Sequence, residues 1–403
     1  MATSIGIIII LGLLVNSLFT KLKLPGLLGM LLLGIAIGPY GFHWLTTDIL
    51  NVSADFRRIA LIIILLRAGL GISKKELSMV GSTALKLSCI PGLVEGFVIA
   101  VISIKLLGFS FIEGGILGFI IAAVSPAVVV PQMLYFSEKG IGTGKGIPTL
   151  ILAGSSIDDV FAITIFSAFM GLYGGSHINV GIQLFNIPVS IVLGIGIGLI
   201  MGMIMVRVFS KFHIRDTKKV LYILGVAILV TALENVFKNK IEIAGLLGVM
   251  TIGFIILEKK PEVAKRLALK LNKVWIFAEI LLFVLVGAQV NVGIALKAGL
   301  VGLAIIFIGL IGRSLGVIIS TIGTNLNFKE KMFCVIAYIP KATVQAAIGA
   351  IPLAMGVASG EIILAIAVLS ILVTAPLGAI GIKLSASRLL TMEKKLQQDT
   401  PNN

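Results

Sequence analysis

The sequence predicts an all-α, polytopic membrane protein, and three observations predict it: the composition, the long apolar runs and the distribution of basic residues. Hydrophobic residues make up 58% of the 403 residues, charged residues make up 13%, and the mean hydropathy is +1.13. So few polar side chains cannot cover a water-soluble body of this size. We therefore expect a multi-pass protein of the cell membrane, either a plasma membrane or a bacterial inner membrane.

Thirteen apolar runs are each long enough to cross a bilayer as a helix, which takes about 17–25 residues. The first run has no basic residue before it and no small-residue cleavage site after it, so we expect a retained helix and not a signal peptide. The third and ninth runs are short or interrupted. In chain order, the predicted crossings are 4–20, 25–41, 57–73, 86–107, 113–136, 147–172, 181–206, 220–236, 242–257, 274–291, 293–321, 332–355 and 361–383.

The basic residues fall on alternate loops, and this predicts the direction of the chain. Apart from Arg67, Arg313 and Lys341, which lie deep within spans, thirty Lys and Arg lie in loops or at the ends of spans. Of these, 24 belong to loops after odd-numbered crossings and six to loops after even-numbered ones. Cytoplasmic loops carry an excess of Lys and Arg, so we expect the N-terminus outside and the C-terminus in the cytoplasm. The net charge of +15 is spread over short loops and not clustered, which argues against a nucleic-acid partner.

Seven ionisable residues fall at bilayer depth, away from the ends of the predicted spans, where a charge is costly unless it is paired or hydrated. Two of them, Asp158 and Asp159, are adjacent in the 147–172 span, and adjacent helical residues point about 100° apart. One carboxylate can therefore face a hydrated cavity while the other meets a neighbouring helix. Ser155 precedes Asp159 by four residues on the same face and offers an oxygen ligand for a hard cation. The alternative is a polar helix start beside a cytoplasmic loop.

Two predicted spans, 113–136 and 332–355, contain prolines in segments that break a helix, at 123–131 and 338–345. Unwound backbone at membrane depth survives only where it is buried in protein or lines a cavity, and transporters place such breaks beside the ion site. The two breaks lie seven crossings apart, so their segments run in opposite directions, which indicates an inverted repeat. Two ordinary proline kinks are the alternative.

Glu95 and Arg313 occupy the fourth and eleventh spans, which are again seven apart, so a repeat would bring them together. A buried guanidinium needs a carboxylate, and either Glu95 or Asp158 could serve, as a structural pair or as a partner that switches during transport. Lys341 lies in the second break, where it can offset the partial charge at a half-helix carboxyl end. Glu279 is its second candidate partner.

The remaining candidates point to structural roles. Arg67 lies near the cytoplasmic end of the third span, where its side chain can snorkel as an anchor. Cys89 and Cys334 lie far apart in apolar stretches without metal spacing, so we expect them to pack in the core. No histidine falls within a predicted span, so carboxylates must carry any protons.

Several of these segments resemble motifs of the cation:proton antiporter-2 group of sodium/proton exchangers, and within it the NHA branch. They are 123–131, 146–150, 154–164 with its Asp pair, and 339–349, supported by 67–70 and by 89–95 with Glu95. The resemblance implies an NhaA-like fold of two six-helix inverted repeats after one extra helix, a homodimer, and no cofactor. It implies exchange of Na⁺ or Li⁺ for protons and no enzymatic activity.

The resemblance also implies a division of one membrane domain, 1–384, followed by a short cytoplasmic tail, 385–403. A scaffold at about 4–73 and 220–291 would hold the dimer, a linker helix would span 181–206, and a core at about 86–172 and 293–383 would move against the scaffold. Asp159 would bind either the cation or the proton, with Asp158 beside it and Ser155 and Ser125 as further ligands. Well-studied electrogenic members carry a lysine where this chain has Arg313. Since arginine effectively cannot release a proton, the stoichiometry stays open.

Two other functions fit parts of the same sequence pattern. A sodium-coupled symporter of organic anions can share the inverted-repeat architecture but would not need the Asp pair. An intramembrane aspartyl protease needs two aspartates that face one another across two helices, whereas both lie on one predicted helix here.

Overall fold

The computed structural model describes residues 1–392 except 23–25, 73, 175–179, 238–242 and 298. Within these residues the chain is helical, with one isolated β-bridge between Ile141 and Met392, so the expected all-α class is confirmed. The helices of the first half are α1 (Ala2–Lys21), α2 (Gly26–Ile37), α3 (Thr47–Asn51), α4 (Ser53–Gly69), α5 (Lys74–Leu107), α6 (Phe111–Ile121), α7 (Pro126–Lys139), the short 3-10 helix η1 (Thr143–Lys145), α8 (Ile147–Tyr173) and α9 (Val180–Lys211). Those of the second half are α10 (Asp216–Phe237), α11 (Gly245–Lys259), α12 (Pro261–Ala288), α13 (Val292–Lys297), α14 (Gly299–Ser320), α15 (Phe328–Ala337), α16 (Thr343–Ile348), α17 (Ile351–Ala354) and α18 (Gly360–Leu389).

The helices confirm a polytopic membrane protein. Eight segments of the described chain are apolar and long enough to cross a bilayer. All thirteen predicted runs overlap a helix or, at the two breaks, successive helices, while the number of crossings and their direction stay predictions. Helices α5 and α12 begin well before their predicted spans, at Lys74 and Pro261, because the Lys, Glu and Leu of these extensions are good helix formers.

Both predicted breaks are present. Helix α6 ends at Ile121 and α7 begins at Pro126, where the missing proline N–H costs no hydrogen bond. Pro131 lies inside α7 and does not interrupt it, so the break is shorter than the predicted 123–131. The second break separates α15 from α16. The two breaks touch, since the Ser125 amide donates to the Pro340 carbonyl over 2.8 Å.

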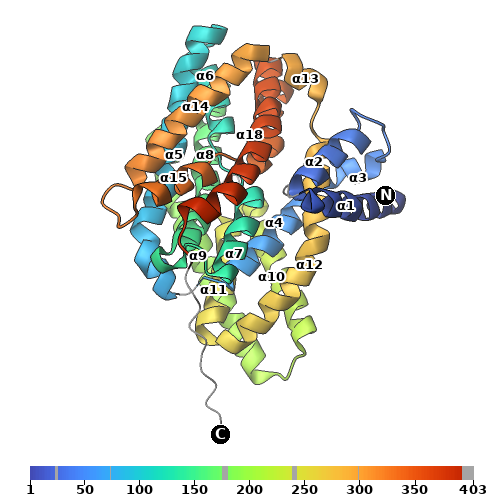
Figure 1. Ribbon diagram of the computed structural model, residues 1–403, viewed down its shortest axis with the longest axis vertical. Helices are drawn as coiled ribbons and strands as arrows, with labels where there is room; N and C mark the ends of the chain where they lie inside the picture. Colours follow the sequence, from blue (N-terminus) through green and yellow to red (C-terminus); the bar gives the residue numbers. More distant parts are fainter. Residues whose placement is uncertain (23–25, 73, 175–179, 238–242, 298, 393–403) are drawn as a thin grey trace.

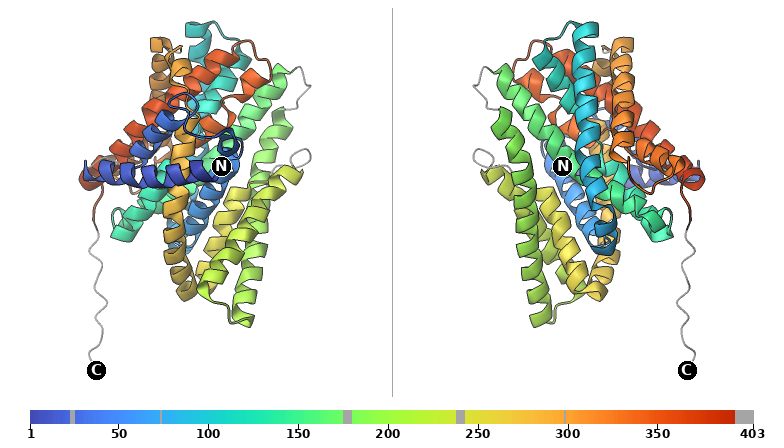
Figure 2. Two further views of the ribbon diagram at one scale, coloured as in Figure 1. Left: turned by 90° about the vertical axis from the view of Figure 1, so that its right-hand side faces the viewer. Right: turned by 90° about the vertical axis from the view of Figure 1, so that its left-hand side faces the viewer.

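The helices pack in two groups that surround the breaks (Figure 1). Helix α5 packs against α6, α8 and α14, while α12 packs against α2 and α4, and α11 against α4 and α9. Helix α1 lies on α2 and α12 and runs across α12 at a steep angle (Figure 2). Glu95, Asp158, Asp159 and Arg313 lie on helices of the first group.

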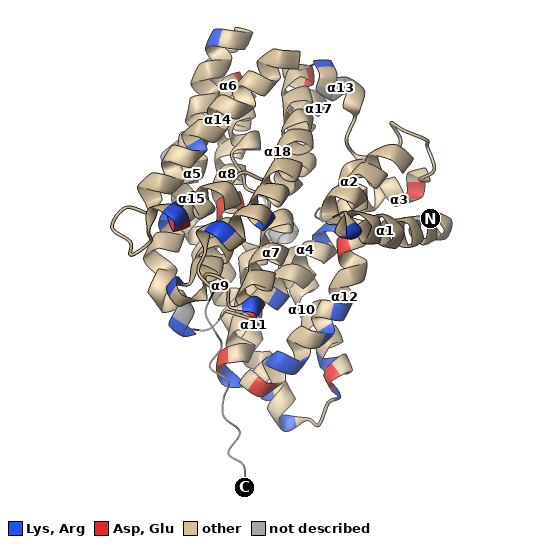
Figure 3. Ribbon diagram, in the orientation of Figure 1, with Lys and Arg blue, Asp and Glu red and all other residues tan. Residues whose placement is uncertain are grey.

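Charged residues are unevenly distributed along the molecule. Figure 3 shows Lys and Arg gathered at the lower end, around the ends of α10, α11 and α12, and few of them at the upper end near α6 and α14. Asp216, at the start of α10, accepts a 2.8 Å hydrogen bond from Arg266 Nε on α12. This bond holds the pKa of the Asp216 carboxyl below its usual range and ties the two helices together.

Candidate functional site

Asp158 is fixed by two donors from outside its own helix, one in the first break and one on α14. Helix α8 passes the first break, and there Asp158 Oδ2 accepts from the Val124 amide at 2.7 Å and from Arg313 Nη2 at 2.9 Å. The side chain is almost completely buried. Asp158 is therefore the member of the aspartate pair that meets a neighbouring helix.

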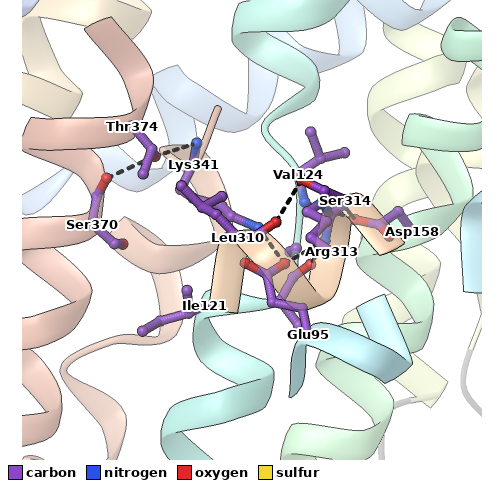
Figure 4. A network of polar contacts seen from close by, with 12 residues as sticks. Glu95, Ile121, Val124, Asp158, Leu310, Arg313, Ser314, Lys341, Ser370 and Thr374 are labelled. Atoms are coloured by element: carbon purple, nitrogen blue, oxygen red, sulfur yellow. Dashed lines mark hydrogen bonds and ion pairs between the residues drawn. The ribbon is translucent and has the colours of Figure 1, made fainter. Parts of the chain in front are cut away.

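Arg313, on α14, connects the two halves of the site (Figure 4). Its Nη1 donates to Glu95 Oε2 at 2.7 Å and to the Ala122 carbonyl at the end of α6. Its guanidinium also lies over the Tyr338 ring, 5.2 Å from the ring centre. The expected proximity of Glu95 and Arg313 is confirmed, and both candidate carboxylates, Glu95 and Asp158, bind this arginine.

Lys341 completes a chain of alternating charges. Its Nζ lies 2.6 Å from Glu95 Oε2, and its amide donates to Thr374 Oγ1 at 2.9 Å. The order Asp158, Arg313, Glu95, Lys341 contains two anions and two cations, all of them buried. Within this chain of four residues the charges cancel, which a buried cluster requires.

Glu279 does not belong to this cluster. It lies on α12, where the cation coupled to it is Arg67, while Lys341 pairs with Glu95. Glu279 is therefore not the partner of Lys341, because Lys341 lies in the break between α15 and α16 and reaches Glu95 on α5. Arg67 is mostly buried and pairs with Glu138 on α7 at 2.7 Å, so it makes a specific ion pair besides any role as an anchor.

Asp159, the other member of the aspartate pair, forms no ion pair with this cluster. It is partly buried, and its Oδ1 is enclosed without a hydrogen-bond partner. Of the described residues, none donates a hydrogen bond to Asp159 or pairs with it. An unpaired carboxylate beside a neutral cluster can take up one positive charge, either a proton or a cation.

The two predicted serine ligands lie near the pair without touching it. Ser155 Oγ donates to the Leu152 carbonyl at 3.3 Å, one turn before Asp159. Ser125, in the first break, lies with its Oγ 3.5 Å from Thr343 Oγ1 in the second. The described residues hold no group of three or more His, Cys, Asp or Glu placed for a metal.

Gln345 is a structural residue of the site that the sequence argument did not single out. Its Nε2 donates to the carbonyls of Ile120, Ile121 and Ala123 at 3.0–3.2 Å. These carbonyls end α6, where a helix has no intrahelical donors left. The sequence did carry a signal for this role, because Gln345 is an amide side chain within the predicted break at 338–345.

The fold and this buried charge cluster define an ion transporter with its site beside two crossed helix breaks. Residues 6–386 match the family model described as sodium/hydrogen exchanger, transmembrane, and the chain belongs to this family. It is 35% identical to sodium/hydrogen exchanger 9B2 of Homo sapiens over 397 residues, covering 93% of this chain and 72% of that protein. The Xenopus tropicalis protein of the same name is 37% identical over 400 residues, covering 93% of this chain and 72% of that one.

A solved structure shows the same fold. The sodium proton antiporter MjNhaP1 from Methanocaldococcus jannaschii at pH 8 superposes with a TM-score of 0.78 at 23% identity, covering 96% of this chain and 97% of that one. The recognition of a sodium/proton exchanger is thus confirmed, and the relatives carry the names of transporters and not of enzymes.

Proposed function

We propose that this chain exchanges Na⁺ or Li⁺ for protons across the cell membrane, with cation and proton competing for Asp159. The observation that carries this proposal is the enclosed, unpartnered Asp159 carboxylate beside a charge-balanced cluster. A site with one negative charge holds one cation or one proton. If the protein changes its open side only when the site is occupied, competition alone couples the two flows.

The proposed movement is an elevator-type alternating access. The core at 86–172 and 293–383 would slide against the scaffold at 4–73 and 220–291 and carry Asp159 with it. Support comes from the contact between the two breaks and from their opposite predicted directions, which fit an inverted repeat. The proposed arrangement has thirteen crossings, the N-terminus outside, the C-terminus in the cytoplasm, and two copies in a homodimer.

We propose that Asp159 is the only proton carrier. Asp158 is held by Arg313 and Val124, and an arginine stays protonated throughout the cycle. Exchange would then be one cation for one proton and move no net charge. Reconstituted liposomes test this: the cation-driven proton flux is expected to be the same with the membrane potential clamped and unclamped, and a clear difference would contradict it.

The Asp159→Asn variant tests the ion site. In everted vesicles of an exchanger-deficient strain, the recovery of a proton-gradient dye signal on adding Na⁺ is expected to vanish. The matched control is Glu361→Gln, which removes an exposed carboxylate far from the cluster and is expected to keep the signal. Unchanged activity of Asp159→Asn would contradict the assignment.

Thermal unfolding of the purified variant separates a lost site from a lost fold. The parent protein is expected to be stabilised by Na⁺ in proportion to its binding, whereas Asp159→Asn is expected to unfold cooperatively at a melting temperature independent of Na⁺. A sodium-coupled organic-anion symporter is not favoured by the relatives. It would be supported only by sodium-dependent uptake of an organic anion without proton movement.

A further inference from the structure

A cavity of about 410 Å³ lies between α4 and α12 on one side and α16 and α18 on the other. Its walls come from the loop after α2, from α3, the start of α4, the end of α12, and from α16 and α18. Neither Asp158 nor Asp159 lines it, although Gln345 does. The cavity is therefore bounded by helices of both the proposed scaffold and the proposed core.

Arg57 brings an uncompensated positive charge to this cavity. Its side chain lines the cavity and the residue is only 8% exposed. Its Nε donates to the Ser53 carbonyl at 3.2 Å. The N–H groups of both terminal nitrogens are not used by this bond. Among the described residues none pairs with or accepts from those nitrogens. Burial removes the Arg57 guanidinium from water, and none of the described carboxylates offsets its charge.

The start of α4 lies in the same wall. Ser53, its first residue, lines the cavity, and no side chain caps the helix at Val52. A helix start carries a partial positive charge and free N–H groups, which favour an anion. Gln289 adds an amide, whose Nε2 donates to Ser53 Oγ at 3.2 Å. A buried guanidinium, a helix start and an amide thus line one cavity.

A buried arginine without a counter-charge is costly, and a bound anion removes that cost. We propose that this cavity is a binding site for a small monovalent anion, a halide or a short carboxylate, held by the terminal nitrogens of Arg57 and the start of α4. The planar guanidinium offers two parallel N–H groups. A carboxylate accepts one hydrogen bond on each of its two oxygens, whereas a halide has one atom to accept both. The site does not include Asp159, the residue proposed to bind Na⁺ and protons.

Thermal unfolding of the purified full chain tests the proposal. At constant Na⁺ and pH, the sodium salt of a bulky sulfonate buffer is replaced stepwise by sodium chloride or by sodium acetate. The melting temperature is expected to rise to a plateau with either anion, and acetate is expected to reach half of the effect at a lower concentration than chloride. Absence of a saturable rise with both anions would overturn the proposal.

Arg57→Gln is expected to raise the half-saturating concentration of both anions by about ten-fold or more, the loss expected when one charged hydrogen bond is removed. Arg58→Gln is the matched control. It removes the same charge from the next residue, which donates to the Thr231 carbonyl and does not line the cavity, and it is expected to keep the anion response. A parental response in Arg57→Gln would overturn the assignment.

A conservative variant keeps the test decisive if Arg57→Gln does not fold. Arg57→Lys retains the charge but not the planar pair of donors, so it is expected to lose the preference for acetate over chloride. An unchanged preference would overturn the placement of the anion at Arg57. Asp159→Asn is expected to keep the anion response while it loses the Na⁺ response, so failure of the ion-exchange proposal and failure of this one are distinguishable.

Discussion

Glu95 Oε2 accepts from both Arg313 and Lys341, so one oxygen atom offsets two buried cations. Glu95→Gln keeps the shape of the side chain and removes that charge. The two cations would then face Asp158 alone, and breaking a buried ion pair by removing one partner costs about 3–5 kcal/mol. We expect a lower melting temperature and little exchange activity.

The control for this variant is again Glu361→Gln, an exposed carboxylate with a weak partner 3.9 Å away. Its free energy of unfolding is expected to stay within about 0.5 kcal/mol of that of the parent, as is usual for surface substitutions. If Glu95→Gln melts like this control, Glu95 does not offset the two cations as the contacts indicate.

Gly154 on α8 packs closely against the hydroxyl of Tyr338. A Cβ on Gly154 would overlap Tyr338 Oη, and that hydroxyl has no hydrogen-bond partner among the described residues. In most helix interiors alanine is more stabilising than glycine, but here we expect Gly154→Ala to cost about 1–3 kcal/mol through overpacking. Thermal unfolding of the purified variant measures the loss.

Tyr338→Phe removes the oxygen that the new methyl group would meet. The double variant is expected to recover most of the stability that Gly154→Ala loses, and Tyr338→Phe alone is expected to change little. No recovery in the double variant would mean that the clash lies elsewhere on α8.

At the scale of elements, the broken helices depend on side chains that complete their ends. Gln345, at α16, donates to three carbonyls at the end of α6. Gln345→Leu is close in size and leaves these acceptors without a donor, at a cost of at least about 2 kcal/mol. We expect a lower melting temperature together with reduced exchange, because the α6–α7 break borders the aspartate pair.

Gln132→Leu is the matched control, since Gln132 donates only to the Val128 carbonyl of its own helix, at 3.2 Å. That carbonyl lies inside α7 and keeps an intrahelical donor. Equal losses in the two variants would show that Gln345 is not needed to end α6.

At the scale of the whole molecule, Arg67 on α4 and Glu138 on α7 join the proposed scaffold to the proposed core. The Glu138 side chain is 61% exposed, so the pair is worth at most about 1 kcal/mol. If the two groups of helices slide past one another, this pair must break in each cycle. Glu138→Gln is then expected to raise the exchange rate at saturating Na⁺ by up to about five-fold.

The initial rate of Na⁺-driven proton flux in liposomes measures this effect, with Glu361→Gln as the control. A rate equal to that of the parent would mean that the pair survives the cycle, which contradicts a sliding movement between α4 and α7.

The sequence by itself determined the properties that depend on local composition. Apolar runs predict membrane helices, prolines at 126 and 340 mark the two breaks, and each charge at bilayer depth is visible as an exception to its surroundings. Pro131 shows the limit of this local signal: its neighbours in α7 keep the helix intact. A proline is tolerated inside a membrane helix when neighbouring groups satisfy the freed backbone.

Only the tertiary structure decided which charges meet. Helical spacing separates Asp158 from Asp159, but the rotation of α8 against α14 makes Asp158 the partner of Arg313 and leaves Asp159 unpaired. Glu95 serves two cations, and Glu279 lies near Arg67 and not near Lys341. These pairings join residues more than a hundred positions apart, and they depend on how the helices pack and not on the composition of any one of them.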